Sequence, residues 1–136
     1  MLQNRSMPAS TVIPVLAYPD VPQAVAWLGA AFGFTLRLGI GDHRAQLNAG
    51  DGAVVVTGGG SPDAGPRGDS VMIRIADVDA HHARARGHGA RIVNPPTDYP
   101  YGERQYTALD PTGRAWTFSQ SIADVDPAFW GGDFRG

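Results

Sequence analysis

The feature that most constrains this chain of 136 residues is an internal repeat, because one small structural unit is written twice. Residues 12–57 read as strand, helix, strand, strand and strand, and residues 70–119 read in the same order. Cap residues recur at matching places, with Asp20 answering Asp77 and Gly33 answering Gly89. We therefore predict a single domain over 1–136, made of module one at 12–57, a linker at 58–69, module two at 70–119 and a C-terminal tail at 120–136.

Apolar runs bounded by turn residues predict the strands of both modules. An aspartate follows each first strand and begins a helix: the helix after Asp20 ends at Gly33, and the helix after Asp77 ends at Gly87 or Gly89. The predicted strands are 12–18, 34–40, 44–49 and 53–57 in module one, and 70–76, 91–94, 104–109 and 115–119 in module two.

Alternation within the strands separates a large apolar face from a small polar face. On the last strand, Trp116 and Phe118 share one side while Thr117 lies on the other. The chain is therefore predicted to have an α+β fold, in which two tandem βαβββ modules form curved mixed sheets around a cavity, with the helices on the outer face. The polar, concave side of this cavity is expected to carry Arg44, Gln46, Ser70, Met72, Arg74, Gln105, Thr107 and Thr117.

Composition argues against several classes of function. The net charge is −2 and there is no basic run, which argues against nucleic-acid binding. No apolar stretch reaches membrane-spanning length, and residues 1–6 lack a secretory apolar core, so we expect a cytoplasmic protein. Cysteine is absent, which removes disulfides, thiolate zinc sites and thiol nucleophiles.

The tandem modules resemble the vicinal oxygen chelate superfamily, which includes glyoxalase I, bleomycin-resistance proteins and extradiol dioxygenases. The resemblance lies in residues 71–80, in Gly89-Ala90, in residues 101–105, and in the turn Asp110-Pro111-Thr112-Gly113 before a last strand that bears Trp116. It covers residues 12 to 119, about the whole of both modules, and implies the fold. It implies less about activity, because one fold hosts many functions.

The resemblance also implies where a metal would bind. Enzymes of this superfamily usually hold a divalent ion through His, Gln or Glu on the first and last strands of each module. Carried over to this chain, those positions fall on Ile13, Val56, Ser70 and Thr117. A shift of one residue gives Pro14, Val55, Val71 or Trp116 instead. None of the eight is a usual ligand for a divalent ion, so we expect neither a metal nor another cofactor.

Arg74 is the strongest candidate for ligand binding, because an arginine in a cavity suits a carboxylate or a phosphate. The alternative is a structural ion pair with an acid such as Glu103. The other predicted ligand-binding residues are Arg44, Gln46, Met72, Tyr101, Gln105, Thr107 and Thr117. Their polar groups can equally satisfy one another.

Histidines and late aromatic residues fit structural roles. His81 and His82 are neighbours on a predicted helix and are interpreted as surface residues, whereas His43 lies at a turn that can reach a cavity mouth. The aromatic residues of segment 129–134 can stack on a planar ligand, cover an apolar edge or reach a second subunit, and we favour packing.

These patterns favour a metal-independent small-molecule binding protein of the glyoxalase/bleomycin-resistance type, one that sequesters an antibiotic or a metabolite. Its expected partners are this small molecule and a second copy of the chain in a homodimer, without nucleic acid or membrane. The alternative is a lyase, an isomerase or a dioxygenase-like enzyme, using Arg74 with a non-family base or displaced metal ligands such as His43 and Glu103. The sequence does not name the ligand.

Overall fold

The computed structural model describes residues 2–65 and 67–136, and it confirms the two tandem βαβββ modules. Module one contains β1 (Val15–Ala17), α1 (Val21–Phe32), β2 (Thr35–Ile40), β3 (Arg44–Ala49) and β4 (Gly52–Thr57). Module two contains β5 (Val71–Arg74), α2 (Val78–Gly87), β6 (Arg91–Tyr99), β7 (Glu103–Leu109) and β8 (Ala115–Ser121). A short 3₁₀ helix, η1 (Pro127–Trp130), lies in the tail. No helix in the described ranges is long and apolar enough to cross a membrane.

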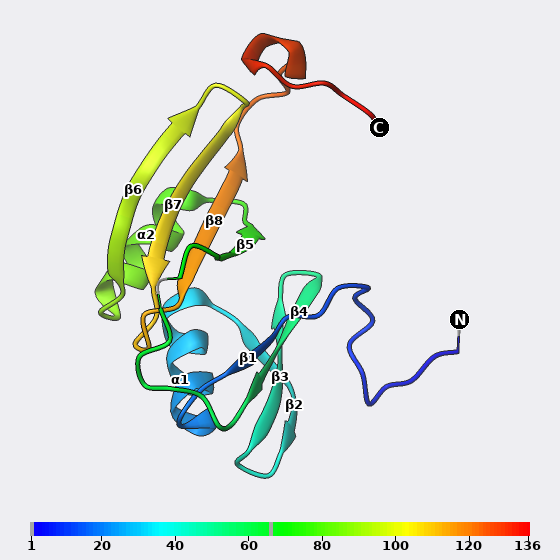
Figure 1. Cartoon of the computed structure of the whole chain (residues 1–136), viewed down its shortest axis with the longest axis vertical. Coiled ribbons are helices and arrows are strands. Elements are labelled where there is room, and N and C mark those ends of the chain that lie inside the picture. Colours follow the sequence, from blue (N-terminus) through cyan, green and yellow to red (C-terminus); the bar gives the residue numbers. More distant parts are fainter. Residues whose placement is uncertain (1, 66) are drawn as a thin grey trace.

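Each module forms its own four-stranded mixed sheet. The strand orders are β1-β4-β3-β2 and β5-β8-β7-β6, with the first strand parallel to the last and the other pairs antiparallel. The sheets remain separate, so they do not close into a barrel. Figure 1 shows them one beyond the other along the long axis of the molecule, and α1 contacts α2 where the modules meet.

The predicted helix caps are present. The Asp20 side chain accepts a hydrogen bond from the backbone N–H of Gln23 at 3.0 Å, and Asp77 accepts one from Ala80 at 3.0 Å. Gly33 ends α1 in the left-handed region, with φ of 78°. These contacts satisfy backbone groups that a helix end leaves without partners, which explains why both helices begin where the sequence predicts.

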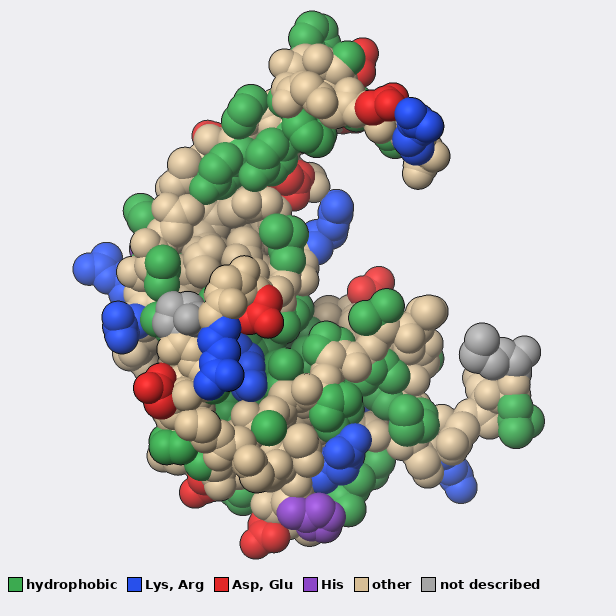
Figure 2. Space-filling view, viewed as in Figure 1, with side chains coloured by type: hydrophobic (Ala, Val, Ile, Leu, Met, Phe, Trp, Pro, Cys, Tyr) green, Lys and Arg blue, Asp and Glu red, His purple; other side chains and the backbone are tan. Residues whose placement is uncertain are grey.

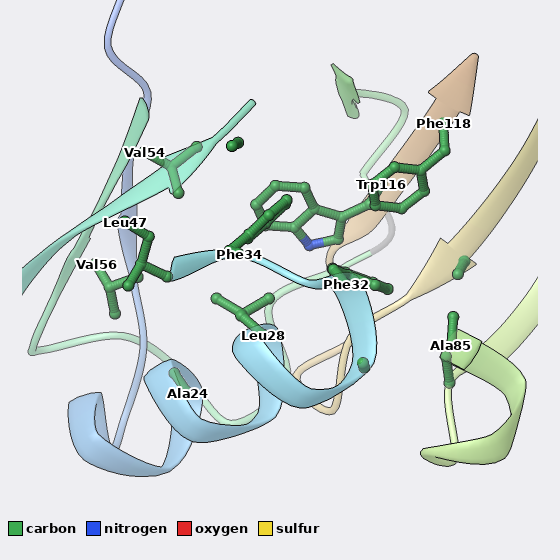
Figure 3. Close-up of a cluster of buried hydrophobic side chains, with 14 of the residues drawn as sticks. Ala24, Leu28, Phe32, Phe34, Leu47, Val54, Val56, Ala85, Trp116 and Phe118 are labelled. Carbon is green, nitrogen blue, oxygen red and sulfur yellow. The ribbon is translucent and has the colours of Figure 1, made fainter. Parts of the chain in front are cut away.

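One hydrophobic core joins the modules (Figure 3). Phe32 at the end of α1 packs against Phe118 of β8 with ring centroids 4.8 Å apart, and Phe34 lies 5.5 Å from Trp116. Burying a large apolar side chain contributes about 1.5–3 kcal/mol. Because the aromatic residues of one module fill the core of the other, the two modules are expected to unfold together.

Most strands shift by one or two residues at an end, and two differ more from their predicted bounds. The first predicted strand, 12–18, is reduced to β1, although the carbonyl of Pro14 still accepts a hydrogen bond from Val55 at 2.8 Å. The strand predicted to end at residue 94 continues as β6 through Pro95 and Pro96. Because β6 is an edge strand with two register irregularities, its prolines do not remove hydrogen bonds between central strands of the sheet.

His81 is not the surface residue that the sequence predicts. Its Nε2 atom lies 3.0 Å from the carbonyl oxygen of Phe32, and its Nδ1 atom is hydrogen-bonded to the hydroxyl of Tyr106. The carbonyl can only accept, so the neutral ring carries its proton on Nε2 and accepts from Tyr106 on Nδ1. Burial lowers the pKa of His81 from 6.5, because the charged ring loses hydration there.

Candidate functional site

The candidate site is the face of the second sheet that points away from the helices. Tyr106, Trp116 and Phe118 are fully buried in the core, and the residues that alternate with them lie on the opposite side of the same strands. We call this side the polar face; its members on the strands are Met72, Arg74, Glu103, Gln105, Thr107, Thr117, Ser119 and Ser121, and Ser70 and Tyr101 lie beside them just before β5 and β7. The predicted separation of an apolar and a polar side in module two is therefore present.

Three hydroxyl groups form one cluster on the polar face. The Oγ1 atoms of Thr107 and Thr117 lie 2.9 Å apart across the β7–β8 pair, and the Oγ of Ser70 lies 3.5 Å from that of Thr117. Hydroxyl groups both donate and accept, so this cluster can rearrange its protons to suit a ligand that offers either.

A second cluster surrounds Glu103. The hydroxyl of Ser119 donates to Glu103 Oε1 at 2.7 Å and accepts from Gln105 Nε2 at 3.0 Å, while Tyr101 donates to Gln105 Oε1 at 3.3 Å. Burial alone would raise the pKa of Glu103. Hydrogen bonds from Ser121 and Ser119 and the charge of Arg74 outweigh it, and they hold that pKa below 4.5. The carboxylate is therefore ionised at neutral pH.

Arg74 lies at the end of β5 beside this cluster. Its Nη1 donates to the hydroxyl of Ser121 at 3.0 Å. No carboxylate in the described part of the chain lies within 4.0 Å of its guanidinium, so the alternative of a close ion pair with Glu103 is not formed. Because a guanidinium has five N–H donors, Arg74 keeps most of its hydrogen-bonding capacity for another group.

Aromatic side chains border the polar face at the end where the tail begins. Tyr99 and Tyr101 stack with ring centroids 5.4 Å apart, and Trp130 of η1 meets Tyr101 edge-on at 5.4 Å. Packing of the tail against the sheet is thus realised for Trp130, while Phe129 and Phe134 remain 84% and 76% exposed.

The two predicted site residues of the first sheet lie elsewhere. Gln46 is only 4% exposed, and both ends of its amide are used: Oε1 accepts from Arg37, and Nε2 donates to the carbonyl of Ser6 at 2.9 Å. Arg37 also donates to the carbonyls of Arg5 and Met7. The N-terminal segment therefore occupies the hydrogen-bonding groups of Gln46. Arg44 is partly exposed at the start of β3 on this same separate sheet.

The residues at the family's metal positions do not fit a divalent ion. Val56 points into the hydrophobic core, so the position predicted in β4 is shifted by one residue. Val55, which pairs with Gln46 of β3, lies on the opposite side of the strand instead. Ile13 precedes β1, while Ser70 and Thr117 offer only hydroxyl groups. Within the described residues no group of three His, Cys, Asp or Glu side chains could hold a metal. His43 lies in the turn before β3 of the first sheet, whereas Glu103 begins β7 of the second.

Glu103, Ser119 and Ser121 join the polar face but are absent from the predicted ligand-binding set. The alternation that selected Thr117 already places Ser119 and Ser121 on the same side of β8, so this signal was sufficient to find them.

Comparisons with known proteins place this geometry in context. The chain matches the model of the Glyoxalase/Bleomycin resistance protein/Dioxygenase superfamily over residues 11–118. The structure of TioX from Micromonospora sp. ML1 is similar, with 37% identity, a TM-score of 0.69, and coverage of 84% of this chain and 100% of TioX. A glyoxalase/bleomycin resistance protein from Streptomyces sp. CB03234 shares the fold at 23% identity and a TM-score of 0.66, covering 82% of this chain and 100% of that protein.

Relatives without a known function are also similar. An uncharacterized protein of Mycobacterium tuberculosis is 30% identical over 94 residues, which is 69% of this chain and 51% of that protein. An uncharacterized protein of Mycobacterium bovis is likewise 30% identical over 94 residues, covering 69% of this chain and 57% of its own length. The chain spans about half the length of the curated relatives it matches.

Proposed function

This chain belongs to the Glyoxalase/Bleomycin resistance protein/Dioxygenase superfamily, and we propose that it is a metal-independent binding protein that sequesters a small molecule on its polar face. The ligand, a metabolite or an antibiotic, has a polar edge for the hydroxyl clusters and an acidic group for Arg74. The border of Tyr101 and Trp130 suits a planar part of the same ligand.

The chemistry of the polar face is the observation that carries this proposal. Thr107, Thr117 and Gln105 offer hydrogen bonds, and Arg74 offers a cation with open N–H groups. Glu103, the carboxylate of the face, is held ionised, so it is no proton donor at neutral pH. Such a set recognises a ligand well, but it lacks the acid and base with pKa values near 7 that proton-transfer catalysis favours.

A homodimer forms part of the proposal. Each sheet leaves one side without a covering helix, and large apolar side chains on the surface include Val15, Leu36 and Met72, which are 54%, 59% and 59% exposed. A second copy would cover these side chains and enclose the ligand. Static light scattering at micromolar concentration tests this, and a particle of 14.4 kDa would contradict it.

Native mass spectrometry tests the binding function directly. Protein purified without denaturation should carry a small molecule that is released on unfolding, and Arg74→Ala should reduce its occupancy while the variant keeps the melting temperature of the wild type. Arg86→Ala is the matched control, because Arg86 is exposed on α2, outside the polar face. Equal occupancy in Arg74→Ala would remove Arg74 from the site.

The alternative enzyme rests on Glu103, an ionised carboxylate beside Arg74 that could act as a base on a bound acid. Metal analysis separates this candidate further. Stoichiometric zinc, nickel, manganese or iron in the purified protein would contradict the metal-independent binding protein and favour the enzyme with displaced ligands.

A further inference from the structure

Residues 58–65 of the segment between the modules form a fixed wall rather than a loose linker. Gly60 donates its N–H to the carbonyl of Tyr18 at 3.2 Å, and Ala64 donates to the carbonyl of Thr112 at 2.6 Å. A Cβ atom on Gly60 would come within 2.4 Å of Ala17, and one on Gly65 would come within 2.9 Å of a carbonyl oxygen. Residues 60–65 are thus held tightly against the end of β1 and the turn before β8.

This wall borders an open hollow of about 420 Å³ where the modules meet. None of the hydrogen-bonding side chains of the polar face lines the hollow, although Ala115 in its lining lies on the same side of β8 as Thr117. Its lining combines small and apolar residues with three charged ones: Leu16, Ala17, Gly60, Ser61, Ala64, Gly65, Arg67, Asp69, Arg114 and Ala115. Figure 2 shows basic side chains beside an acidic one near the centre of the view, next to hydrophobic surface.

The two arginines that line the hollow keep side-chain N–H donors available for a ligand. Arg114 is oriented by one bond from Nη1 to the carbonyl of Ala17 at 3.2 Å and by the ring of Tyr18, whose centroid lies 4.8 Å from its Cζ. The exposed Arg67 forms no ion pair within 4.0 Å in the described ranges, and Asp69, the acid of the lining, lies in no such pair with either arginine. The lining of the hollow therefore includes two arginines and one aspartate.

From this geometry we propose that the hollow binds a small carboxylic acid with an aliphatic body, independently of the polar face. Guanidinium groups match the two oxygens of a carboxylate with paired N–H donors. The lining carries two positive charges and one negative charge, which balance a monoanion better than a dianion. Leu16, Ala64 and Ala115 supply the apolar contact for the body of the acid.

Hexanoate is the probe, titrated into uniformly ¹⁵N-labelled protein at constant ionic strength while the arginine Nε–H signals are recorded. The signals of Arg67 and Arg114 should shift and saturate. Arg67→Gln should weaken hexanoate binding at least about fivefold, because it removes a charge-assisted hydrogen bond. Asp69→Asn should tighten binding, because it removes the repelling carboxylate.

Arg86→Gln, an exposed arginine on α2, is the matched control for loss of one positive charge, and Arg74→Ala tests independence from the polar face; both should leave the hexanoate affinity unchanged. Inorganic phosphate at the same concentrations should shift these signals less than hexanoate does. Shifts that rise linearly without saturation, equal affinity in Arg67→Gln, or saturation by phosphate but not by hexanoate would each overturn the proposal.

Discussion

Replacing Asp110 should destabilise the whole fold, because this carboxylate ties the two modules together. It is 4% exposed, and Oδ2 accepts hydrogen bonds from the hydroxyl of Tyr18 at 2.6 Å and from Trp116 Nε1 at 3.0 Å. Oδ1 accepts from the N–H and the hydroxyl of Thr112 and from the N–H of Arg114. The residue thus joins the end of β1 to the β7–β8 turn.

The size of the expected loss of stability follows from the hydrogen-bond donors that the substitution leaves without an acceptor. Asp110→Ala would leave the buried hydrogen-bond donors of Tyr18, Trp116 and Thr112 without their acceptor. Each buried donor without a partner costs about 1–3 kcal/mol, and water entering the space recovers part of this. We expect a loss of about 3–5 kcal/mol in the free energy of unfolding. Because domains of this kind have about 5–15 kcal/mol in total, the variant should be close to its unfolding limit.

Urea denaturation followed by tryptophan fluorescence measures this loss. Tyr18→Phe removes one of the bonds and should cost about 1.5–3 kcal/mol, giving a graded result even if Asp110→Ala does not fold. Asp126→Ala is the control: Asp126 is an exposed aspartate that caps η1, and its loss should cost about 1 kcal/mol or less. A loss below about 1 kcal/mol for Asp110→Ala would refute the role given to this carboxylate.

Three further outcomes follow from single residues. The folded-state pKa of His81 lies below 6.5, so the unfolded chain binds a proton there more readily than the folded protein does. The melting temperature should therefore fall as the pH drops through 6.5, and this fall should be smaller in His81→Gln than in the control His88→Gln. The folded-state pKa of Glu103 lies below 4.5, so the ionised carboxylate stabilises the fold above pH 4.5, and this stabilisation is lost as the pH falls through the folded-state pKa. Glu103→Gln should therefore show a smaller acid-induced loss of melting temperature than the wild type. Gly102→Ala should cost about 2 kcal/mol or more by urea denaturation, because its φ is 83° and a Cβ would meet Ala123 O at 2.4 Å, whereas Gly50→Ala, with φ of 62° and open space, should cost less.

Local signals determined most of the fold. The helix α1 and the strand β3 lie where caps and turns predict them, because Asp20, Gly33 and the turns around β3 act on their own neighbours. The continuation of β6 through Pro95 and Pro96 could not be predicted in this way. Whether a strand tolerates proline depends on its lying at a sheet edge, and that is a property of the assembled sheet.

The candidate site was predictable on the second sheet and not on the first. Alternation along β8 located Thr117 and its neighbours, since successive side chains must point to opposite sides. The same reasoning placed Gln46 on an open face, but its partner Ser6 is distant in the sequence, and no local pattern announces such a contact. The register of β4 fails for a related reason: Val55 and Val56 are chemically alike, and a shift of one residue exchanges the two sides.

The two modules share one topology, yet they leave different chemistry on corresponding sides of their sheets. In module one, Val55 is buried beside Gln46, and the amide of Gln46 is bonded to Arg37 and to the N-terminal segment. In module two, the corresponding positions carry Thr117 and Thr107, which bond to each other and stay partly exposed. Hydroxyl groups that are satisfied within the chain do not oppose folding, yet a ligand can still share them. The two similar modules therefore differ in the side chains that they present, and the partly exposed hydroxyl groups of module two are the reason why we propose ligand binding on its sheet.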